Sequence, residues 1–309
     1  MWKSVKRLIL ETSRGVQTHN VPTLAAALAF FATFSVVPGV ILLVAVGGMF
    51  LGEQATRAEV LAQLQLWIGT TGADFVEGAV ANRAESDGAS FWASTAGVAL
   101  VLVGATRFFA ELQFALNTVW DVEPRRRVRF LEILRKRALS FALILVLVLF
   151  LIASIAVSAV VAALAKYAQP VLSGYAASWE LANFAISFVL SAVLLTLVLK
   201  YFPDAKIRWR DAAPGAALTA FTLLLGKFAL GYYIGQSAFA STYGAAGSII
   251  VFLIFVYLAA TIVLVGAEFT QVWARHHGQK IVPESHARRV RRRFGRRRPA
   301  SADTVSEEE

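Results

Sequence analysis

The feature that most constrains this chain is a series of six long apolar segments. They cover approximately residues 24–52, 91–118, 139–164, 180–202, 212–234 and 248–273. Each is long enough to cross a hydrocarbon core, which takes about 20 residues of α-helix. Over the whole chain, a hydrophobic content of 57% would make a soluble surface very hard to build. The sequence therefore predicts an all-α polytopic membrane protein with six transmembrane helices.

The basic residues predict how these helices are threaded through the membrane. Most of the 30 Lys and Arg residues lie in the N-terminal segment, in alternate loops and in the C-terminal tail. When the segments are threaded in order, the other side of the membrane holds only Arg57, Arg83 and Lys166. Because cytoplasmic loops carry the excess of Lys and Arg, both termini are predicted to be cytoplasmic. The net charge of +10 then indicates contact with an anionic inner leaflet before it indicates nucleic acid.

The chain divides into three parts on this pattern. Residues 1–21 read as a cytoplasmic amphipathic helix at the membrane interface, because apolar and basic residues recur there at helical spacing. Residues 22–274 hold the six helices. Residues 275–309 form a basic cytoplasmic tail, expected to be disordered beyond about residue 285.

Three local features refine this outline. Pro38 lies near the middle of the first apolar segment, where it predicts a kink or a break. The loop 53–90 is expected to carry a short helix lying on the membrane surface. The uncharged connection 237–248 is rich in Gly, Ala and Ser, and both a re-entrant segment and a tight outer turn fit it.

Residues suited to catalysis or metal binding do not occur in a recognisable pattern. The four histidines, His19, His276, His277 and His286, flank the apolar segments, and none joins a carboxylate at HExxH-like spacing. There is no cysteine, no phosphate-binding glycine loop, and no histidine within a segment to activate a serine. We therefore predict no catalytic residue, metal or cofactor, and a protein that is not an enzyme.

Ionisable groups inside the apolar segments are the remaining functional candidates, because burying a charge in a membrane is costly. Arg107 and Glu111 are four residues apart and share a helix face, with Asn117 near that face. Counted at 1.5 Å per residue, Arg107 and Glu268 lie about 24 Å and about 30 Å from the outer ends of their helices, so they could meet, whereas Lys227 lies only about 10 Å deep. Two interpretations stay open: a network of Arg107, Glu111 and Glu268 that pins helices together, or a path that contacts a substrate.

The segment 200–216 is the most distinctive in the chain. Pro203 is expected to end the fourth helix, and Pro214 to lie in the first turn of the fifth, with Asp211 as its cap. Between the prolines lies a basic, aromatic turn that suits lipid headgroups or plain anchoring at an interface. Its candidate headgroup contacts are Lys206, Arg208, Trp209 and Arg210.

Four stretches together resemble the YihY/BrkB family of bacterial inner-membrane proteins. They are PTLAAALAFFATFSVVPGVILL (22–43), GATRFFAELQFALNTVWDVEP (104–124), YFPDAKIRWRDAAPGA (201–216) and FASTYGAAGSIIVFLIFVYLAATIVLVGAEFTQVWA (239–274). The resemblance implies a six-helix inner-membrane protein linked to envelope integrity and export of lipids or other envelope components. Some members carry a ribonuclease BN label, which nothing in this sequence supports. The family motif residues present here are Arg107, Glu111, Asn117, Pro203, Asp204, Trp209, Pro214, Gly215, Tyr243, Gly244, Gly247 and Glu268.

Two functions from different classes follow. The first is transport, export or lipid handling of an anionic envelope component, with Arg107 and Lys227 for anionic groups and Glu268 for charge balance. The second is a non-catalytic membrane scaffold, favoured by the basic loops and by small-residue faces such as Gly231 and Gly235, which also suit a homo-oligomer. The arginine run 288–298 follows a last membrane helix closely, a position more typical of contact with anionic lipid than with RNA.

Overall fold

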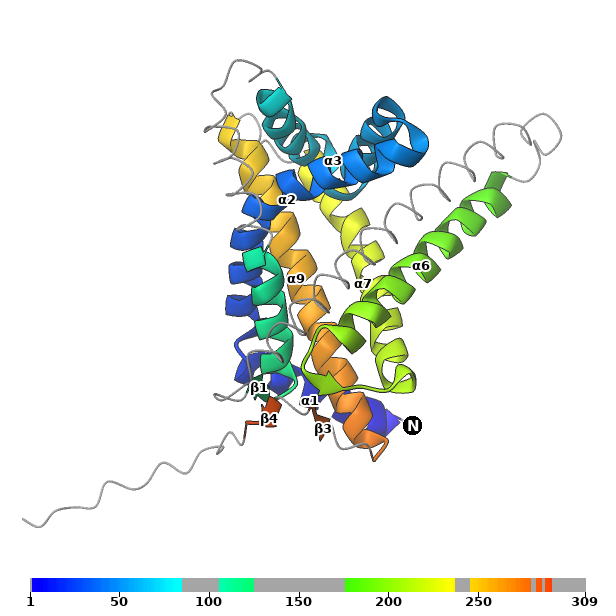
Figure 1. Cartoon of the computed structure of the whole chain (residues 1–309). Helices are drawn as coiled ribbons and strands as arrows, with labels where there is room; N and C mark the ends of the chain where they lie inside the picture. Colours follow the sequence, from blue (N-terminus) through cyan, green and yellow to red (C-terminus); the bar gives the residue numbers. More distant parts are fainter. Residues whose placement is uncertain are drawn as a thin grey trace, which may run out of the picture.

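The computed structural model describes residues 2–84, 106–124, 176–236, 245–278, 282–284 and 287–290, and it is almost entirely helical (Figure 1). The labelled helices are α1 (Trp2–Thr18), α2 (Val21–Leu51), α3 (Glu53–Ala84), α6 (Ala176–Tyr201), α7 (Trp209–Gln236) and α9 (Ala245–His276). Residues 106–119 form a further helix. Four short strands complete the described part: β1 (Val122–Pro124), β2 (Ala205–Lys206), β3 (Val282–Pro283) and β4 (Ala287–Arg289).

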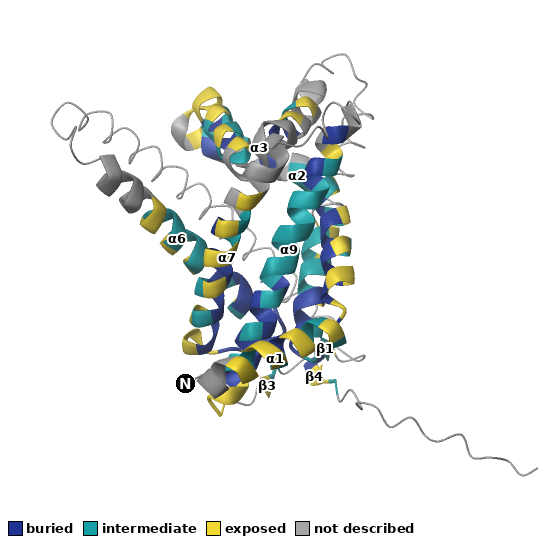
Figure 2. Cartoon of the chain, turned by 180° about the vertical axis from the view of Figure 1, so that it is seen from behind, coloured by how far each residue is buried: buried dark blue, intermediate teal, exposed yellow. Residues whose placement is uncertain are grey.

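The long helices stand side by side, and their two ends differ. α1 lies across one end of α2 and α9, together with the four strands (Figure 1). We call this the strand-bearing end. α3 packs against α2 and α9 at the opposite end. α6 lies against α7 near the strand-bearing end and leans away from the other helices at its far end. Figure 2 shows the buried residues gathered at the strand-bearing end. The fold is therefore tightest where α1 and the strands lie.

Two hydrophobic clusters reflect this difference. The larger one joins α2, the helix 106–119, α6, α7 and α9 around fully buried side chains such as Leu116, Trp120, Leu199 and Leu264. The smaller one holds Val40, Val60, Val76 and Phe252, and ties α3 to α2 and α9. α3 is therefore longer than the short helix predicted within 53–90, whose position on the membrane surface stays a prediction.

The turn between α2 and α3 is compact because of its glycines. Gly52 has a φ of 86°, a left-handed conformation that ends α2, and its N–H donates to Gly48 O at 3.0 Å. A Cβ on Gly47 would lie 2.5 Å from Thr56 Cγ2, so the two helices approach closely. α2 itself runs without interruption from Val21 to Leu51, so a break does not occur at Pro38, and the alternative of a kink there stays a prediction.

α7 and α9 meet at a seam of reciprocal glycine and threonine contacts. A Cβ on Gly215 would lie 1.7 Å from Thr270 Oγ1, and a Cβ on Gly266 would lie 1.7 Å from Thr219 Oγ1. Each threonine hydroxyl also donates at 2.7 Å to the carbonyl of the glycine four residues before it on its own helix. Small residues allow helix backbones this close. Gly215 therefore has a packing role in the structure.

The predictions made from the two prolines of segment 200–216 differ in how they agree with the structure. α6 ends at Tyr201, two residues before Pro203, as predicted. α7 begins at Trp209, so Pro214 lies inside the helix and Asp211 lies in its first turn. The expected cap is therefore wrong. The carbonyl of Arg208 accepts from the N–H groups of both Asp211 and Ala212, which starts the helix one turn earlier than the proline suggested.

The C-terminal tail folds back onto two loops. β4 pairs antiparallel with β1, and β3 pairs antiparallel with β2. Glu284 N donates to Asp204 O at 2.9 Å, and Val290 N donates to Asp121 O at 2.8 Å. The prediction of disorder beyond about residue 285 is therefore wrong for residues 287–290. Their backbone groups find partners in loops that are distant in sequence, which the composition of the tail does not reveal.

Within the described residues, two helices are long and apolar enough to cross a membrane: Phe184–Tyr201 within α6 and Ile249–His276 within α9. A third span arises if the bent pair Lys6–Thr18 and Val21–Val36 is counted as one, with a 61° bend between them. Helices do occupy the predicted positions 24–52, 180–202, 212–234 and 248–273. The segment 139–164, residues 91–105 and residues 237–244 lie outside the described residues, so the count of six and the re-entrant segment stay predictions.

Candidate functional site

A buried histidine in the turn between α1 and α2 organises the polar groups of the strand-bearing end. His19 is 6% exposed. Its backbone N–H donates to the carbonyl oxygen of Gly15 at 2.9 Å, which prolongs the last turn of α1. Asn20 then adopts a left-handed conformation with a φ of 50°, and α2 begins at Val21 with Pro22 in its first turn. The sharp change of direction between the two helices turns the imidazole inward.

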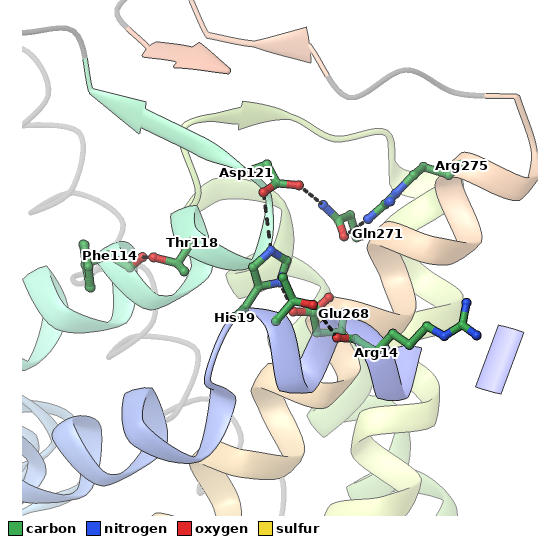
Figure 3. Close-up of polar contacts among 9 residues, drawn as sticks. Arg14, His19, Phe114, Thr118, Asp121, Glu268, Gln271 and Arg275 are labelled. Carbon is green, nitrogen blue, oxygen red and sulfur yellow. Dashed lines mark hydrogen bonds and ion pairs between the residues drawn. The ribbon is translucent and has the colours of Figure 1, made fainter. Parts of the chain in front are cut away.

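His19 contacts a fully buried carboxylate of α9. Its Nδ1 bonds to Oε1 of Glu268, a residue with 0% exposure (Figure 3). The other oxygen of Glu268, Oε2, has no hydrogen-bond partner among the residues that the structure describes. This oxygen lies against Gly15 of α1, where an added Cβ would be 2.3 Å away. The glycine therefore makes the room in which the Glu268 carboxylate lies.

The second ring nitrogen of His19 faces a second carboxylate. Nε2 lies 3.4 Å from Oδ1 of Asp121, which follows the helix 106–119 with a φ of 51°. Gln271 donates from Nε2 to Oδ2 of Asp121 at 3.5 Å, and the guanidinium of Arg275 donates to Gln271 Oε1. Figure 3 shows these five side chains reaching one place from α1, α9 and the turn after residue 119. We call His19, Asp121, Glu268, Gln271 and Arg275 the histidine cluster.

The charges of the cluster favour a protonated histidine. Burial by itself lowers the pKa of His19, but hydrogen bonds to Asp121 and Glu268 and the charges of both carboxylates outweigh it and raise the pKa from 6.5 to about 9. For Asp121, burial raises the pKa, yet the bond to His19, the charges of His19 and Arg275 and the bond from Gln271 bring it below 3.8. The cluster therefore favours an imidazolium at His19, with Asp121 ionised, near neutral pH.

A cavity of about 320 Å³ opens beside the cluster. Its polar lining includes Asp121, Glu123, Asp204 and Asn117, and its apolar lining includes Phe114 and Val290. The side chain of Asn117 donates to Asp204 Oδ2 at 3.0 Å and accepts from the Asp204 N–H at 2.7 Å, so these two buried residues join the helix 106–119 to the loop after α6. Asn117 and Asp204 therefore hold one wall of the cavity in place.

The predicted network of Arg107, Glu111 and Glu268 does not form. Arg107 is exposed and Glu111 half-buried, and within the described residues neither has an ion pair, whereas Glu268 pairs with His19. Depth counted along the sequence therefore did not identify the partner of Glu268, which is His19. The side chain of Lys227, and Tyr243 and Gly244, lie outside the described residues; Gly247 is buried near the start of α9.

The basic, aromatic turn between α6 and α7 has a defined geometry. Lys200 Nζ donates to Ile207 O at 2.8 Å and lies 5.3 Å and 5.2 Å from the ring centres of Tyr201 and Trp209. Both rings are 50% exposed. The candidate contacts Lys206, Arg208 and Arg210 are exposed as well. We call Lys200, Tyr201, Lys206, Arg208, Trp209 and Arg210 the headgroup turn.

Sequence reasoning missed the centre of the histidine cluster. It treated His19 as one of four flanking histidines and left Asp121, Gln271 and Arg275 unassigned. A signal was present, since Thr12, Gly15 and His19 recur at intervals of three and four residues and so share one face of α1. Within the described residues, no group of three His, Cys, Asp or Glu side chains is arranged to hold a metal ion.

Comparisons with known proteins find relatives that are named membrane proteins. A UPF0761 membrane protein of Pseudoalteromonas translucida is 26% identical over 80% of this chain and 79% of its own length. Relatives of the same name from Alkalilimnicola ehrlichii (29% identical over 58% of this chain) and Paraburkholderia xenovorans (25% over 85%) are longer, and the match spans 39% and 59% of their lengths. No solved structure matches.

The family comparison covers nearly the whole described region. The model of the family described as Virulence factor BrkB matches residues 12–291, which include α1 from Thr12, the histidine cluster and the paired strands of the tail. The apolar helices and the names of the relatives agree on a membrane location. The resemblance noted from the sequence is thereby confirmed: this chain is a membrane protein of the BrkB (YihY, UPF0761) family.

Proposed function

We propose that this membrane protein transports, exports or otherwise handles an anionic lipid or another anionic envelope component in the bacterial inner membrane. In this proposal six helices cross the membrane and both termini are cytoplasmic, so the strand-bearing end faces the anionic inner leaflet. No enzymatic step is part of it. The observation that carries the proposal is the geometry of the headgroup turn.

The headgroup turn combines the features that a phosphate-bearing headgroup needs. Lys200 is held by one backbone carbonyl and two aromatic rings, and its ammonium has three donors, so donors remain for an anion. Exposed Tyr201 and Trp209 suit the level of the headgroups. Arg208 and Arg210 add exposed charges that attract an anionic surface, each by about 1 kcal/mol.

Of the three ionisable residues predicted to contact or balance the charge of a substrate, one has a different role in this proposal. Arg107, exposed on the helix 106–119, and Lys227 stay candidates for contact with anionic groups of the substrate. Glu268 is enclosed by His19 and Gly15, so we assign it to charge balance within the histidine cluster and not to substrate contact.

Native mass spectrometry of gently extracted protein tests the proposal. The double variant Arg208→Ala/Arg210→Ala removes two charges from the headgroup turn, and Lys200→Met removes the ammonium held over the rings. The matched control is Arg7→Ala/Arg14→Ala, which removes two exposed charges from α1 near the same end.

We expect the wild type and the control to retain a defined anionic lipid or envelope precursor in fixed ratio. Both headgroup-turn variants should lose it. Retention of the same bulk phospholipid by all four proteins would contradict the proposal.

A scaffold for envelope machinery is the second candidate. It is favoured by the way the tail strands, the histidine cluster and the Asn117–Asp204 pair fasten several loops of one end into a single unit. Such a unit suits docking of partner proteins or of further copies of the chain. An envelope phenotype that survives Arg107→Ala and Lys227→Ala but is lost on removal of exposed charges from the strand-bearing end would favour the scaffold.

A further inference from the structure

We propose that His19, Asp121 and Glu268 form a proton-exchange site, in which His19 carries a proton between the cavity beside Asp121 and the buried carboxyl of Glu268. Glu268 lies within the apolar span Ile249–His276, so the site connects a polar cavity with the interior of a membrane helix. This inference adds a ligand, the proton, that the proposed handling of an anionic component does not include. It holds whatever the substrate is.

The first argument is the use of both ring nitrogens. Nδ1 of His19 faces Glu268 and Nε2 faces Asp121, and each partner oxygen belongs to a carboxylate. An ionised carboxylate only accepts hydrogen bonds, and a neutral imidazole has a single N–H. A neutral histidine between two ionised carboxylates can donate to only one of them. Both contacts become hydrogen bonds only when the three residues hold one further proton. The contact geometry therefore defines a place for one additional proton.

The second argument is the charge balance. The charged groups that face His19 are Asp121 from the turn after residue 119, and Glu268 and, through Gln271, Arg275 from α9. α1 brings Gly15 against Glu268, and no charged side chain among its described residues bonds to the imidazole. With His19 protonated, two positive charges balance two negative charges. Without that proton, two carboxylates flank a neutral imidazole, and the charge of the fully buried Glu268 has no adjacent cation, which is strongly disfavoured.

The third argument is the open position on Glu268. A carboxylate that served only as a structural anchor would be expected to have both oxygens satisfied, because an unpaired buried oxygen costs about 1–3 kcal/mol. Oε2 of Glu268 has no hydrogen-bond partner among the described residues, and it occupies the space left by the missing side chain of Gly15. A proton on Glu268 removes the charge from this unpaired group.

Access and proton balance complete the route. Asp121 lines the cavity, whereas Glu268 is fully buried. The route begins with the deprotonated cluster, before the additional proton is taken up. There a neutral His19 with its proton on Nδ1 accepts a second proton on Nε2 from Asp121, which has taken it from water in the cavity. The imidazolium then gives its Nδ1 proton to Glu268 Oε1. His19 is left neutral with its proton on Nε2, Asp121 is ionised, and Glu268 is a carboxylic acid, so one proton has moved and none is lost.

Infrared spectroscopy after a rapid drop in pH, from above pH 9 to neutral, tests the route on the full chain in nanodiscs of phosphatidylethanolamine and phosphatidylglycerol, because the cluster then starts without its additional proton. Loss of a carboxylic-acid band in Glu268→Gln assigns that band to Glu268. In Asp121→Asn the same band should appear roughly a hundredfold more slowly, because general acid–base groups contribute on that scale. Ala110→Trp, which fills the cavity without touching His19, should slow it as well.

The matched control is Glu123→Gln. Glu123 lines the same cavity but pairs with Arg288 and not with His19, so its loss should leave the rate unchanged. Slow appearance of the Glu268 band in Asp121→Asn or Ala110→Trp, with a wild-type rate in Glu123→Gln, supports the proposal. If Asp121→Asn does not fold, the rate in Ala110→Trp is compared with the rate in the control. Equal rates in all variants, or no band that depends on Glu268, would overturn it and leave the histidine cluster a static ion pair. Lipid retention plays no part in the measurement, so its result is separate from the test of the headgroup turn.

Discussion

Two of the helices that pack against α9 hold it in opposite ways within five residues. Gly266 and Thr270 face α7 through direct contact of small side chains. Glu268, two residues from each and therefore turned by about 200° around the helix, faces α1 through an ion pair with His19. The α7 contact depends on shape, and a proton has no effect on it. The α1 contact depends on charge, so a change of protonation acts on it directly. One helix can thus be fixed on one face and responsive on the other.

The largest expected effect comes from removing the centre of the charged contact. His19→Ala leaves Glu268 buried beside a second carboxylate with no cation between them, which should cost about 4 kcal/mol of stability. Unfolding by SDS titration in mixed micelles measures it. The control is His277→Ala, an exposed histidine whose ring lies on Trp273, which should change stability little. Equal losses in both variants would show that the charged contact does not stabilise α1.

The pH dependence of stability should follow next. The pKa of His19 is raised from 6.5 to about 9, so its contribution is complete below pH 6.5 and is lost as the pH rises through 9, up to about 3 kcal/mol in all. The pKa of Asp121 is lowered from 3.8, so its contribution is present above that value and is lost as the pH falls through the lowered pKa. Thermal unfolding followed by size-exclusion chromatography from pH 6 to pH 10 should show the alkaline loss. His19→Gln should flatten the curve, and an equally steep curve in that variant would assign the loss to other groups.

The shape-dependent contact gives a smaller expected effect. Gly266→Ala places a Cβ 1.7 Å from Thr219 Oγ1, which is fixed by its bond to Gly215 O, and should cost about 2 kcal/mol. The same SDS titration measures this loss, which should not vary between pH 6 and pH 10. Gly226→Ala on α7 is the control, because its Cβ would meet only the end of the Ile262 side chain at 3.3 Å. A similar loss in both variants would mean that adding a methyl group anywhere along the seam is costly.

The smallest effect is expected from the exposed ion pair of the strands. Arg288 and Glu123 are 56% and 42% exposed, and solvent screens such pairs, so Arg288→Ala should cost less than about 0.5 kcal/mol. The loss of stability in Arg288→Ala is compared with the loss in His19→Ala in the same SDS titration. The difference measures how much more a buried ion pair stabilises this end of the molecule than an exposed one. A loss as large as that of His19→Ala would show that the side chain of Arg288, and not only the backbone of β4, holds the tail.

The sequence predicted the helices better than it predicted their partners. Apolar length and the position of Pro203 are local properties, and they placed α2, α6, α7 and α9 closely. Partners depend on how helices are offset, and Glu268 shows the consequence. It was correctly singled out as a buried ionisable group, but Arg107, chosen by depth, is not its partner.

The tail and α3 were missed for related physical reasons. β3 and β4 are two and three residues long in an Arg-rich stretch, and they exist because loops far away in the chain offer backbone partners. α3 is rich in polar residues, so its composition suggested a loop, although Val60 and Val76 pack into a core with Phe252. Pairing and packing between segments distant in sequence are not encoded in local composition.

The position of β4 near the end of the described chain has a consequence for biogenesis. The loops that carry β1 and β2 are synthesised well before their partners, β4 and β3. During translation these loops lack their final backbone partners, and they gain them only after the ribosome has released the segment 282–290. The pairing of these strands therefore forms only after synthesis has passed the last helix, and a chain that ends before residue 282 leaves both loops without these backbone partners.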